Sequence, residues 1–298
     1  MLSFIVSHKK ESPEKFWYNN CQLKKEITMR LLAIFAHPDD EVFSCGGTLA
    51  RYAAEGHQVN LICATRGEEG EIIHPEIDPE RYPKGSERGL LRKAELEEAC
   101  KELGISAPFF LNHHDSGFPI EVGLRNPKAF MNQEIFSIEH ELLDHITKIR
   151  PNIIITFDPH GMYGHLDHIT IHRAALAAFW SAGGVMQPAP QRLYFPVKTI
   201  AQIEKMQASS DSTTPQMDPR RYGVSEDSIC AEIDISAYEN QKRNGINAHR
   251  SQLGNKERIE EMLKRRPNSF FRVESFALGG MRGGFPTYIV NDLFEELG

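Results

Sequence analysis

Short apolar runs alternate with longer amphipathic stretches along most of the chain. Apolar runs of this kind are typical of strands in the interior of a sheet, and they lie at residues 31–36, 59–65, 108–112, 152–157 and 193–197. Helical periodicity or helix-stop glycines mark the stretches between them, at residues 46–56, 86–103, 132–149 and 165–180. Parallel strands need such crossover connections. The pattern therefore predicts an α/β fold, Rossmann-like, with a mainly parallel β-sheet and helices on both faces.

The last third of the chain has a less regular pattern. We expect a weak helix after residue 197, an exposed loop at 208–220, a strand near 228–234, a long polar helix from about 236 and a terminal strand at 270–276. The antiparallel or irregular parts of the sheet are predicted to lie in this region.

Residues 1–28 are polar and aperiodic for most of their length, and Met29 directly precedes the first predicted strand. We therefore expect residues 1–28 to form a loosely ordered extension and residues 29–298 to form one domain. No internal repeat or linker-like segment divides the second range.

Composition and charge narrow the classes of function. With 41 acidic and 34 basic residues the net charge is -7, which disfavours nucleic acid and acidic lipid surfaces as partners. No run reaches the roughly eighteen apolar residues of a membrane span. Five widely spaced cysteines without a CxxC pair indicate no disulfide framework, and they favour a reducing, cytoplasmic location. A small polar molecule is the expected partner, and the oligomeric state stays open, a homo-oligomer included.

Polar residues follow the first predicted strand directly. The stretch LLAIFAHPDDEVF (residues 31–43) ends its apolar run in His37, Pro38, Asp39 and Asp40. Pro38 cannot continue a strand ladder, so the strand should end there with one imidazole and two carboxylates crowded at its tip. The same residues would also suit an ordinary helix start, where acidic groups lie near the positive end of the helix dipole.

A second polar cluster favours a site over a helix start. Residues 158–172 read DPHGMYGHLDHITIH and carry four of the thirteen histidines, again just after a predicted strand. In open α/β sheets, ligands bind outside the carboxyl ends of the strands, which is where both clusters fall. Imidazoles and carboxylates that are buried together need a positive charge between them. We therefore predict a divalent metal site.

The residue types suit a catalytic zinc site better than a structural one. His37, Asp40 and His168 would supply two imidazoles and one carboxylate, leaving coordination positions for water. Zinc lowers the pKa of bound water from about 16 to about 7, which makes hydroxide available at neutral pH. Fe2+ is the alternative metal, because the same ligand types hold Fe(II) in oxygenases.

Three neighbouring residues are candidates for moving protons. Asp39, beside a ligand but itself free, would act as the general base. His165 lies three residues before His168 and would protonate a leaving group or stabilise an oxyanion. Asp167 would hold an imidazole in the required tautomer.

Together, these motifs resemble the LmbE/PIG-L family of metal-dependent N-acetylglucosaminyl deacetylases. The resemblance rests on HPDDE and GHLDH, and it continues in TRGEEG, RKAEL, DSG and AHRSQ at residues 65–70, 92–96, 115–117 and 248–252. It implies the same three metal ligands and the same general base, with Asp167 supporting His165.

The resemblance also implies roles that the pattern alone does not show. Tyr163 would assist at the oxyanion. Arg92 would contact the substrate, and Asp115 would bind it from a loop near the sugar. A supporting or structural part is expected for the remaining polar residues of the motifs: His114, His160, His172 and Glu68.

The expected reaction is hydrolysis of the N-acetyl group from an N-acetylglucosamine conjugate, which releases acetate and a free amine. The sequence does not identify the aglycone. One alternative is an amidase that cleaves a bulkier acyl group from a glucosaminyl thiol conjugate. An Fe(II) oxygenase is disfavoured by the βα alternation, and a non-catalytic sugar- or metal-binding module would have no need of the Asp39 carboxylate.

Overall fold

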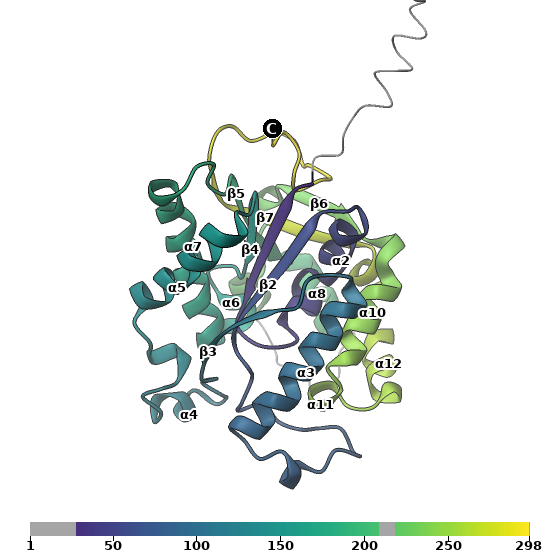
Figure 1. Cartoon of the computed structure of the whole chain (residues 1–298). Coiled ribbons are helices and arrows are strands. Elements are labelled where there is room, and N and C mark those ends of the chain that lie inside the picture. The colour runs from purple at the N-terminus through teal and green to yellow at the C-terminus, as the bar shows by residue number, and fades with distance from the viewer. Residues whose placement is uncertain (1–27, 209–217, 298) are drawn as a thin grey trace, which may run out of the picture.

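The computed structural model describes residues 28–208 and 218–297, which form one sheet flanked by helices (Figure 1). The strands of that sheet are β1 (Arg30–Phe35), β2 (Gln58–Thr65), β3 (Phe109–His113), β4 (Ile153–Thr156), β5 (Arg192–Val197), β6 (Ala231–Asp234) and β7 (Val273–Met281). Their order is β3-β2-β1-β4-β5-β7-β6. The strands from β3 to β5 are parallel, whereas β7 is antiparallel to both of its neighbours. The predicted Rossmann-like architecture is confirmed, with its antiparallel part in the last third.

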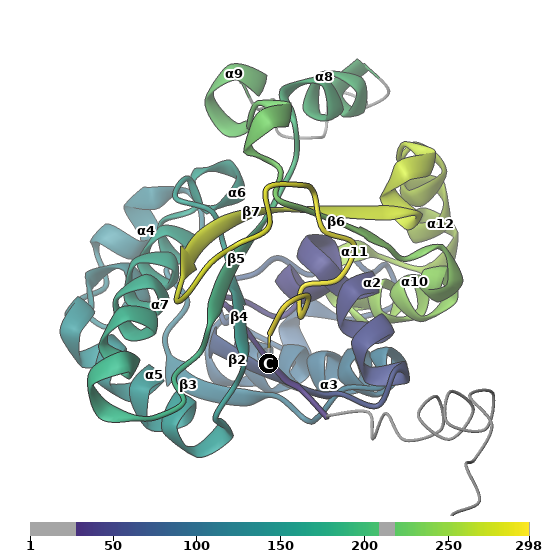
Figure 2. The ribbon, with the colours of Figure 1, turned by 90° about the horizontal axis from the view of Figure 1, so that it is seen from above.

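Helices cover both faces of the sheet, as Figure 2 shows. One face carries α2 (Asp40–Ala54), α3 (Ser86–Leu103) and α10 (Glu239–Ala248), and the other carries α5 (Ile135–Ile149) and α7 (Leu166–Val185). The shorter helices are α4 (Ile120–Leu124), α6 (Gly161–Gly164), α8 (Ile200–Ala208), α9 (Pro219–Tyr222), α11 (Arg250–Leu253) and α12 (Lys256–Lys264). Short 3-10 turns complete the chain: η1 (Pro79–Arg81), η2 (Phe130–Asn132), η3 (Glu226–Ser228), η4 (Ser236–Tyr238) and η5 (Asn268–Phe271).

Local chemistry accounts for where the main elements begin and end. The run from Leu31 to Ala36 is at most 1% exposed, so β1 is buried on both faces as its composition predicts. Helix α3 ends at Gly104, whose φ of 73° lies in the left-handed region that glycine enters freely. Helix α5 starts later than predicted because the side chain of Glu134 accepts hydrogen bonds from the backbone N–H groups of the first turn.

The long polar helix predicted from about residue 236 is wrong, because several short elements occupy that stretch. After η4, helix α10 ends at Ala248, and α11 and α12 follow it separately. The break between α11 and α12 falls at Gly254, whose φ of 99° is incompatible with a helix interior. The terminal strand is also shifted, since η5 occupies residues 268–271 and β7 begins at Val273.

The topology creates a crevice between β1 and β4. These strands lie side by side, and the hydroxyl of Thr156 on β4 donates to the carbonyl oxygen of Ile34 on β1 at 2.9 Å. The chain leaves β1 through α2 on one face and leaves β4 through α7 on the other. At such a switch point the connections diverge and leave room for a ligand at the carboxyl ends of the strands. Both predicted polar clusters follow these two strands.

Two expectations concern residues that the structure does not describe. The predicted extension lies outside the described residues apart from Thr28, and so does most of the predicted loop at 208–220. The division into an extension and one domain therefore stays a prediction. Within the described ranges, no helix has the length and apolar character needed to cross a bilayer.

A close approach between α2 and the residue that precedes η4 leads to a stability prediction. A Cβ atom at Gly47 would lie 2.4 Å from Cδ1 and 2.7 Å from Cβ of Ile235, which is fully buried. We expect Gly47→Ala to lower the free energy of unfolding by about 1–3 kcal/mol in urea denaturation.

The neighbouring Gly46 provides a matched control for Gly47→Ala. A Cβ atom at Gly46 would meet its nearest neighbours at 3.6 Å, an ordinary contact. Gly46→Ala should therefore leave the free energy of unfolding unchanged or raise it by up to about 1 kcal/mol. Equal stability of the two variants would contradict the packing of α2 described above.

Candidate metal centre

His37 and Asp40 lie on the turn that joins β1 to α2. The backbone N–H of His37 donates to Oδ2 of Asp40 at 2.7 Å, so the carboxylate itself closes the turn. Asp39, between them, has a φ of 105°, in the left-handed region that is strained for a residue other than glycine. Its backbone N–H donates to Oε2 of Glu41 at 3.0 Å, and Oε1 of Glu41 lies 2.7 Å from Nε2 of His249. The strained residue is therefore held by a buried Glu–His pair.

One ring nitrogen of His37 faces one ring nitrogen of His168. Nε2 of His37 lies 3.1 Å from Oδ2 of Asp167, and Nδ1 of His168 lies 3.1 Å from the carbonyl oxygen of Gly161. Because carboxylate and carbonyl oxygens accept hydrogen bonds, we assign the ring protons to these outer nitrogens. The inner nitrogens, Nδ1 of His37 and Nε2 of His168, then face each other at 3.1 Å, and both are acceptors when the rings are neutral. Two such lone pairs repel unless positive charge lies between them.

The carboxylate of Asp40 completes a cage of three residues with these two nitrogens. Its Oδ1 lies 3.3 Å from Nε2 of His168, and its Oδ2 lies 3.5 Å from Nδ1 of His37. A tetrahedral metal with bonds of about 2.0–2.1 Å has ligand atoms about 3.3 Å apart, so the cage fits Zn2+ or a similar ion. His165 also offers a nitrogen within 4.8 Å of those of His37 and His168. The carboxylate of Asp40 is closer and supplies the negative charge that a cation needs.

The charges of the cage shift pKa values in opposite directions. Burial lowers the pKa of His37, but the nearby carboxylates, Asp115 first and then Asp167, outweigh burial and raise it well above its usual value. Burial raises the pKa of Asp40, but His168 and His37 outweigh it and hold that pKa well below its usual value. Both directions show that the cage attracts positive charge.

Asp39 stands beside the cage with a pKa suited to accepting a proton. Burial raises the pKa of Asp39 to about 6, although Arg92 opposes this and Asp40 adds to it. Nη2 of Arg92 lies 3.3 Å from Oδ2 of Asp39. A carboxylate with a pKa near neutrality is an effective general base at physiological pH.

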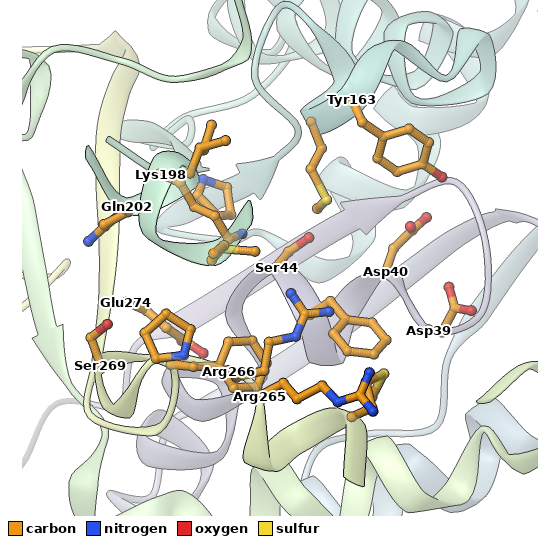
Figure 3. A pocket seen from close by; sticks show the side chains of 18 of the residues that line it. Asp39, Asp40, Ser44, Tyr163, Lys198, Gln202, Arg265, Arg266, Ser269 and Glu274 are labelled. Atoms are coloured by element: carbon orange, nitrogen blue, oxygen red, sulfur yellow. The ribbon is translucent and has the colours of Figure 1, made fainter. Parts of the chain in front are cut away.

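His165 and Tyr163 provide neutral hydrogen-bond donors. Nδ1 of His165 accepts the backbone N–H of Asp167 at 3.2 Å, so the proton of the neutral ring lies on Nε2. Burial, followed by the charges of His37 and His168, lowers the pKa of His165 to about 4, which leaves the ring neutral at pH 7. Burial raises the pKa of the Tyr163 hydroxyl, which points towards Asp40 (Figure 3).

Asp167 and Asp115 lie behind the cage. The resemblance pairs Asp167 with His165, but its carboxylate contacts His37 and accepts the backbone N–H of Ser116 at 2.9 Å as well as the Ser116 hydroxyl. Asp115 is 4% exposed, and its Oδ1 lies 3.4 Å from Nε2 of His37. Both carboxylates thus orient the imidazole of His37.

Arg92 is also buried, at 4% exposure. Its Nη2 donates to the carbonyl oxygen of Pro38 at 2.6 Å, and its Nη1 donates to that of Gly67 at 3.0 Å. The guanidinium therefore ties the turn of Asp39 to the loop after β2. Neither Arg92 nor Asp115 contributes to the wall of the pocket described below.

The sequence interpretation gave no role to Glu41, His249 or Ser116. The AHRSQ motif contains His249, but its partner Glu41 lies 208 positions away, so the motif alone could not reveal the pair. Four other polar residues of the motifs contact the rest of the fold, as expected: His114 (Glu69), Glu68 (backbone of Asp115), His172 (carbonyl of Phe157) and His160 (ring of Tyr222).

A pocket of about 850 Å³ opens from the cage. Asp39, Asp40 and Tyr163 line one end of it, and the other walls come from β5, α8, α12 and the start of β7 (Figure 3). The cage therefore lies at the end of a space large enough for a small-molecule substrate.

Comparisons with known proteins identify relatives of this chain. A family model described as PIG-L, GlcNAc-PI de-N-acetylase, matches residues 32–179, which contain the whole cage. The 1D-myo-inositol 2-acetamido-2-deoxy-alpha-D-glucopyranoside deacetylase of Thermobifida fusca is 36% identical over 239 residues, covering 75% of this chain and 83% of the relative.

Two solved structures share the fold. N,N'-diacetylchitobiose deacetylase from Pyrococcus horikoshii has a TM-score of 0.59 at 17% identity and covers 91% of this chain and 94% of its own. GalB, the 4-carboxy-2-hydroxymuconate hydratase from Pseudomonas putida KT2440, has a TM-score of 0.56 at 17% identity, covering 87% and 99%. At 17% identity, these two structures show a shared fold. The Thermobifida relative, with its higher identity and coverage, shows the family. The chain belongs to the PIG-L family of N-deacetylases.

Proposed function

We propose that the chain is a Zn2+-dependent hydrolase that removes the N-acetyl group of an N-acetylglucosamine conjugate. One observation supports the proposal most directly: Nδ1 of His37 and Nε2 of His168 face each other at 3.1 Å beside the carboxylate of Asp40, at the end of a large pocket. The family supports the substrate class, because the Thermobifida relative is named for an acetamido sugar linked to inositol.

His37, Asp40 and His168 would hold the metal. When bound, a divalent cation supplies a Lewis acid that polarises the acetamide carbonyl and lowers the pKa of water to about 7. Two imidazoles and one carboxylate, with no thiolate, are a common ligand set for catalytic Zn2+. Fe2+ accepts the same ligands and is the alternative.

Asp39 moves the proton in the proposed reaction. As water attacks the carbonyl carbon, the carboxylate accepts one of its protons, and a pKa of about 6 keeps that carboxylate mostly ionised at pH 7. When the C–N bond breaks, Asp39 returns the proton to the departing nitrogen. The products are acetate and a free amine.

His165 and Tyr163 stabilise the negative charge that develops on the carbonyl oxygen. Both are neutral donors, through Nε2–H and the hydroxyl respectively, and neither has to lose a proton to act. The tautomer of His165 thus favours stabilisation of the oxyanion over protonation of the amine. A bulkier acyl group would use the same residues, so paired assays on acetyl and bulky amides separate these two substrates.

Replacing Asp39 tests the general base. Asp39→Asn should lower kcat for acetate release by about 10²–10⁴-fold, with the bound metal unchanged in elemental analysis. Asp78→Asn, which removes a carboxylate from the exposed start of η1, is the control and should keep wild-type turnover. Near-native activity of Asp39→Asn would show that the base is another group.

Replacing His168 tests the metal ligands. His168→Ala should lose both the metal and the acetate release, because it removes one of three ligand atoms. The exposed His160 on the same segment is the matched control, and His160→Ala should retain a full complement of metal. Dialysis against a chelator and reconstitution with Zn2+ or Fe2+ then identifies the active ion. Stoichiometric metal in His168→Ala would contradict the ligand assignment.

Replacing Arg92 separates positioning from substrate binding. Arg92→Lys keeps the positive charge, but a lysine cannot donate hydrogen bonds to the carbonyl oxygens of both Pro38 and Gly67. The side chain of Asp39 should therefore lose its alignment. We expect kcat to fall about 10- to 100-fold, with KM changed less than about threefold. A raised KM at unchanged kcat would instead place Arg92 in direct contact with the substrate.

A further inference from the structure

The substrate pocket has a far wall that lies outside the part of the chain matched by the family model. At about 850 Å³ the pocket falls in the upper part of the range of about 300–1,000 Å³ for small-molecule sites. Its far wall includes Lys198, after β5, and Arg266, after α12, whereas the family model covers residues 32–179. The group attached to the sugar would therefore meet side chains that the family motifs do not include.

Lys198 and Arg266 have no carboxylate in ion-pair contact among the residues that the structure describes. Another cation of the lining, Lys242, is paired, since its Nζ lies 2.8 Å from Oε1 of Glu274. Figure 3 shows Lys198 and Arg266 directed into the pocket. Two unpaired cations on one wall repel each other, and an anion bound between them removes that repulsion.

Both side chains line the same pocket. Burial lowers the pKa of Lys198 to about 8, and the charges of Arg266 and Lys242 contribute. The guanidinium carbon of Arg266 lies 5.8 Å and 5.4 Å from the ring centres of Phe43 and Phe270. Cation–π contacts of this kind hold a guanidinium in place without using its N–H donors, which stay available for an anion.

Two acidic residues of the pocket lining, Glu274 and Asp158, are engaged elsewhere. Glu274 accepts from Lys242 and also from two backbone N–H groups of α2, at 3.0 Å and 2.7 Å. Asp158 accepts the backbone N–H groups of His160 and Met162, at 2.8 Å and 3.2 Å. These carboxylates stabilise the fold locally, and the positive charge of Lys198 and Arg266 is left facing the pocket.

We propose that Lys198 and Arg266 form an anion-binding end of the pocket, so that the preferred substrate is an N-acetylglucosamine conjugate whose aglycone carries a carboxylate or a phosphate. This inference rests on the proposed function and specifies its substrate class. The name of the Thermobifida relative specifies inositol, a neutral polyol, so an acidic aglycone would be a different substrate from the one that name gives. A carboxylate and a phosphate both suit a guanidinium fork beside an ammonium group.

Three glycosides of matched size test the proposal with the full, metal-loaded chain. N-acetylglucosamine is linked to a neutral polyol, to a hydroxy carboxylic acid, or to the same polyol through a phosphate. We expect kcat/KM for acetate release to be at least about tenfold higher for one of the anionic glycosides than for the neutral one. Whichever anionic glycoside has the higher kcat/KM identifies the preferred anion as a carboxylate or a phosphate.

Charge-removing variants then locate the effect. Arg266→Gln and Lys198→Gln should each lower kcat/KM for the favoured anionic glycoside by about 10- to 100-fold, mainly through KM. The neutral glycoside should lose less, so that the ratio of kcat/KM for the anionic glycoside to that for the neutral one falls about tenfold, and the remaining neutral turnover shows that the variants fold. Lys264→Gln removes the same charge from an exposed position of α12 outside the pocket wall, and it should leave all three rates unchanged.

Two results would contradict the inference without affecting the proposed deacetylase function. These are equal kcat/KM for the three glycosides, and a uniform loss for all of them in Arg266→Gln and Lys198→Gln. Failure to release acetate from any glycoside would overturn the proposed function together with the inference.

Discussion

The site depends on two imidazole nitrogens, Nδ1 of His37 and Nε2 of His168, that face each other at 3.1 Å. Their orientation is imposed from behind, by the carboxylate of Asp167 and the carbonyl of Gly161, and His168 stacks on Phe157 at a ring separation of 4.0 Å. Because each outer nitrogen is committed as a donor, each inner nitrogen is an acceptor when its ring is neutral. Such a pair, with His168 fully buried, is stable only around positive charge.

The fold makes this arrangement between two neighbouring parallel strands, β1 and β4, whose connections leave on opposite faces of the sheet. The turn after β1 carries His37 and Asp40, and the segment after β4 carries His168. The strained backbone of Asp39 is held there from the C-terminal third of the chain, through Glu41 and His249. Conformational strain at the proposed general base is thus balanced by a buried contact remote in sequence.

The proposed reaction and the proposed substrate preference involve different parts of the molecule. The cage lies within residues 32–179, whereas the far wall of the pocket comes from segments after β5 and after α12. The fold alone does not determine the reaction, since a hydratase shares it at a TM-score of 0.56. We therefore infer hydrolysis from the metal-binding atoms of the cage, and an acidic aglycone from Lys198 and Arg266.

The sequence by itself determined the α/β architecture, the strand ends and the residues of the cage. These are local features, because an apolar run and the polar residues at its end lie within about ten positions of each other. Tertiary structure decided that Asp167 holds His37, that Arg92 lies behind Asp39, and that the polar helix near residue 236 is broken. Such partners are separated by tens to hundreds of positions, and a hydrogen bond forms only where the folded chain brings its atoms within about 3 Å.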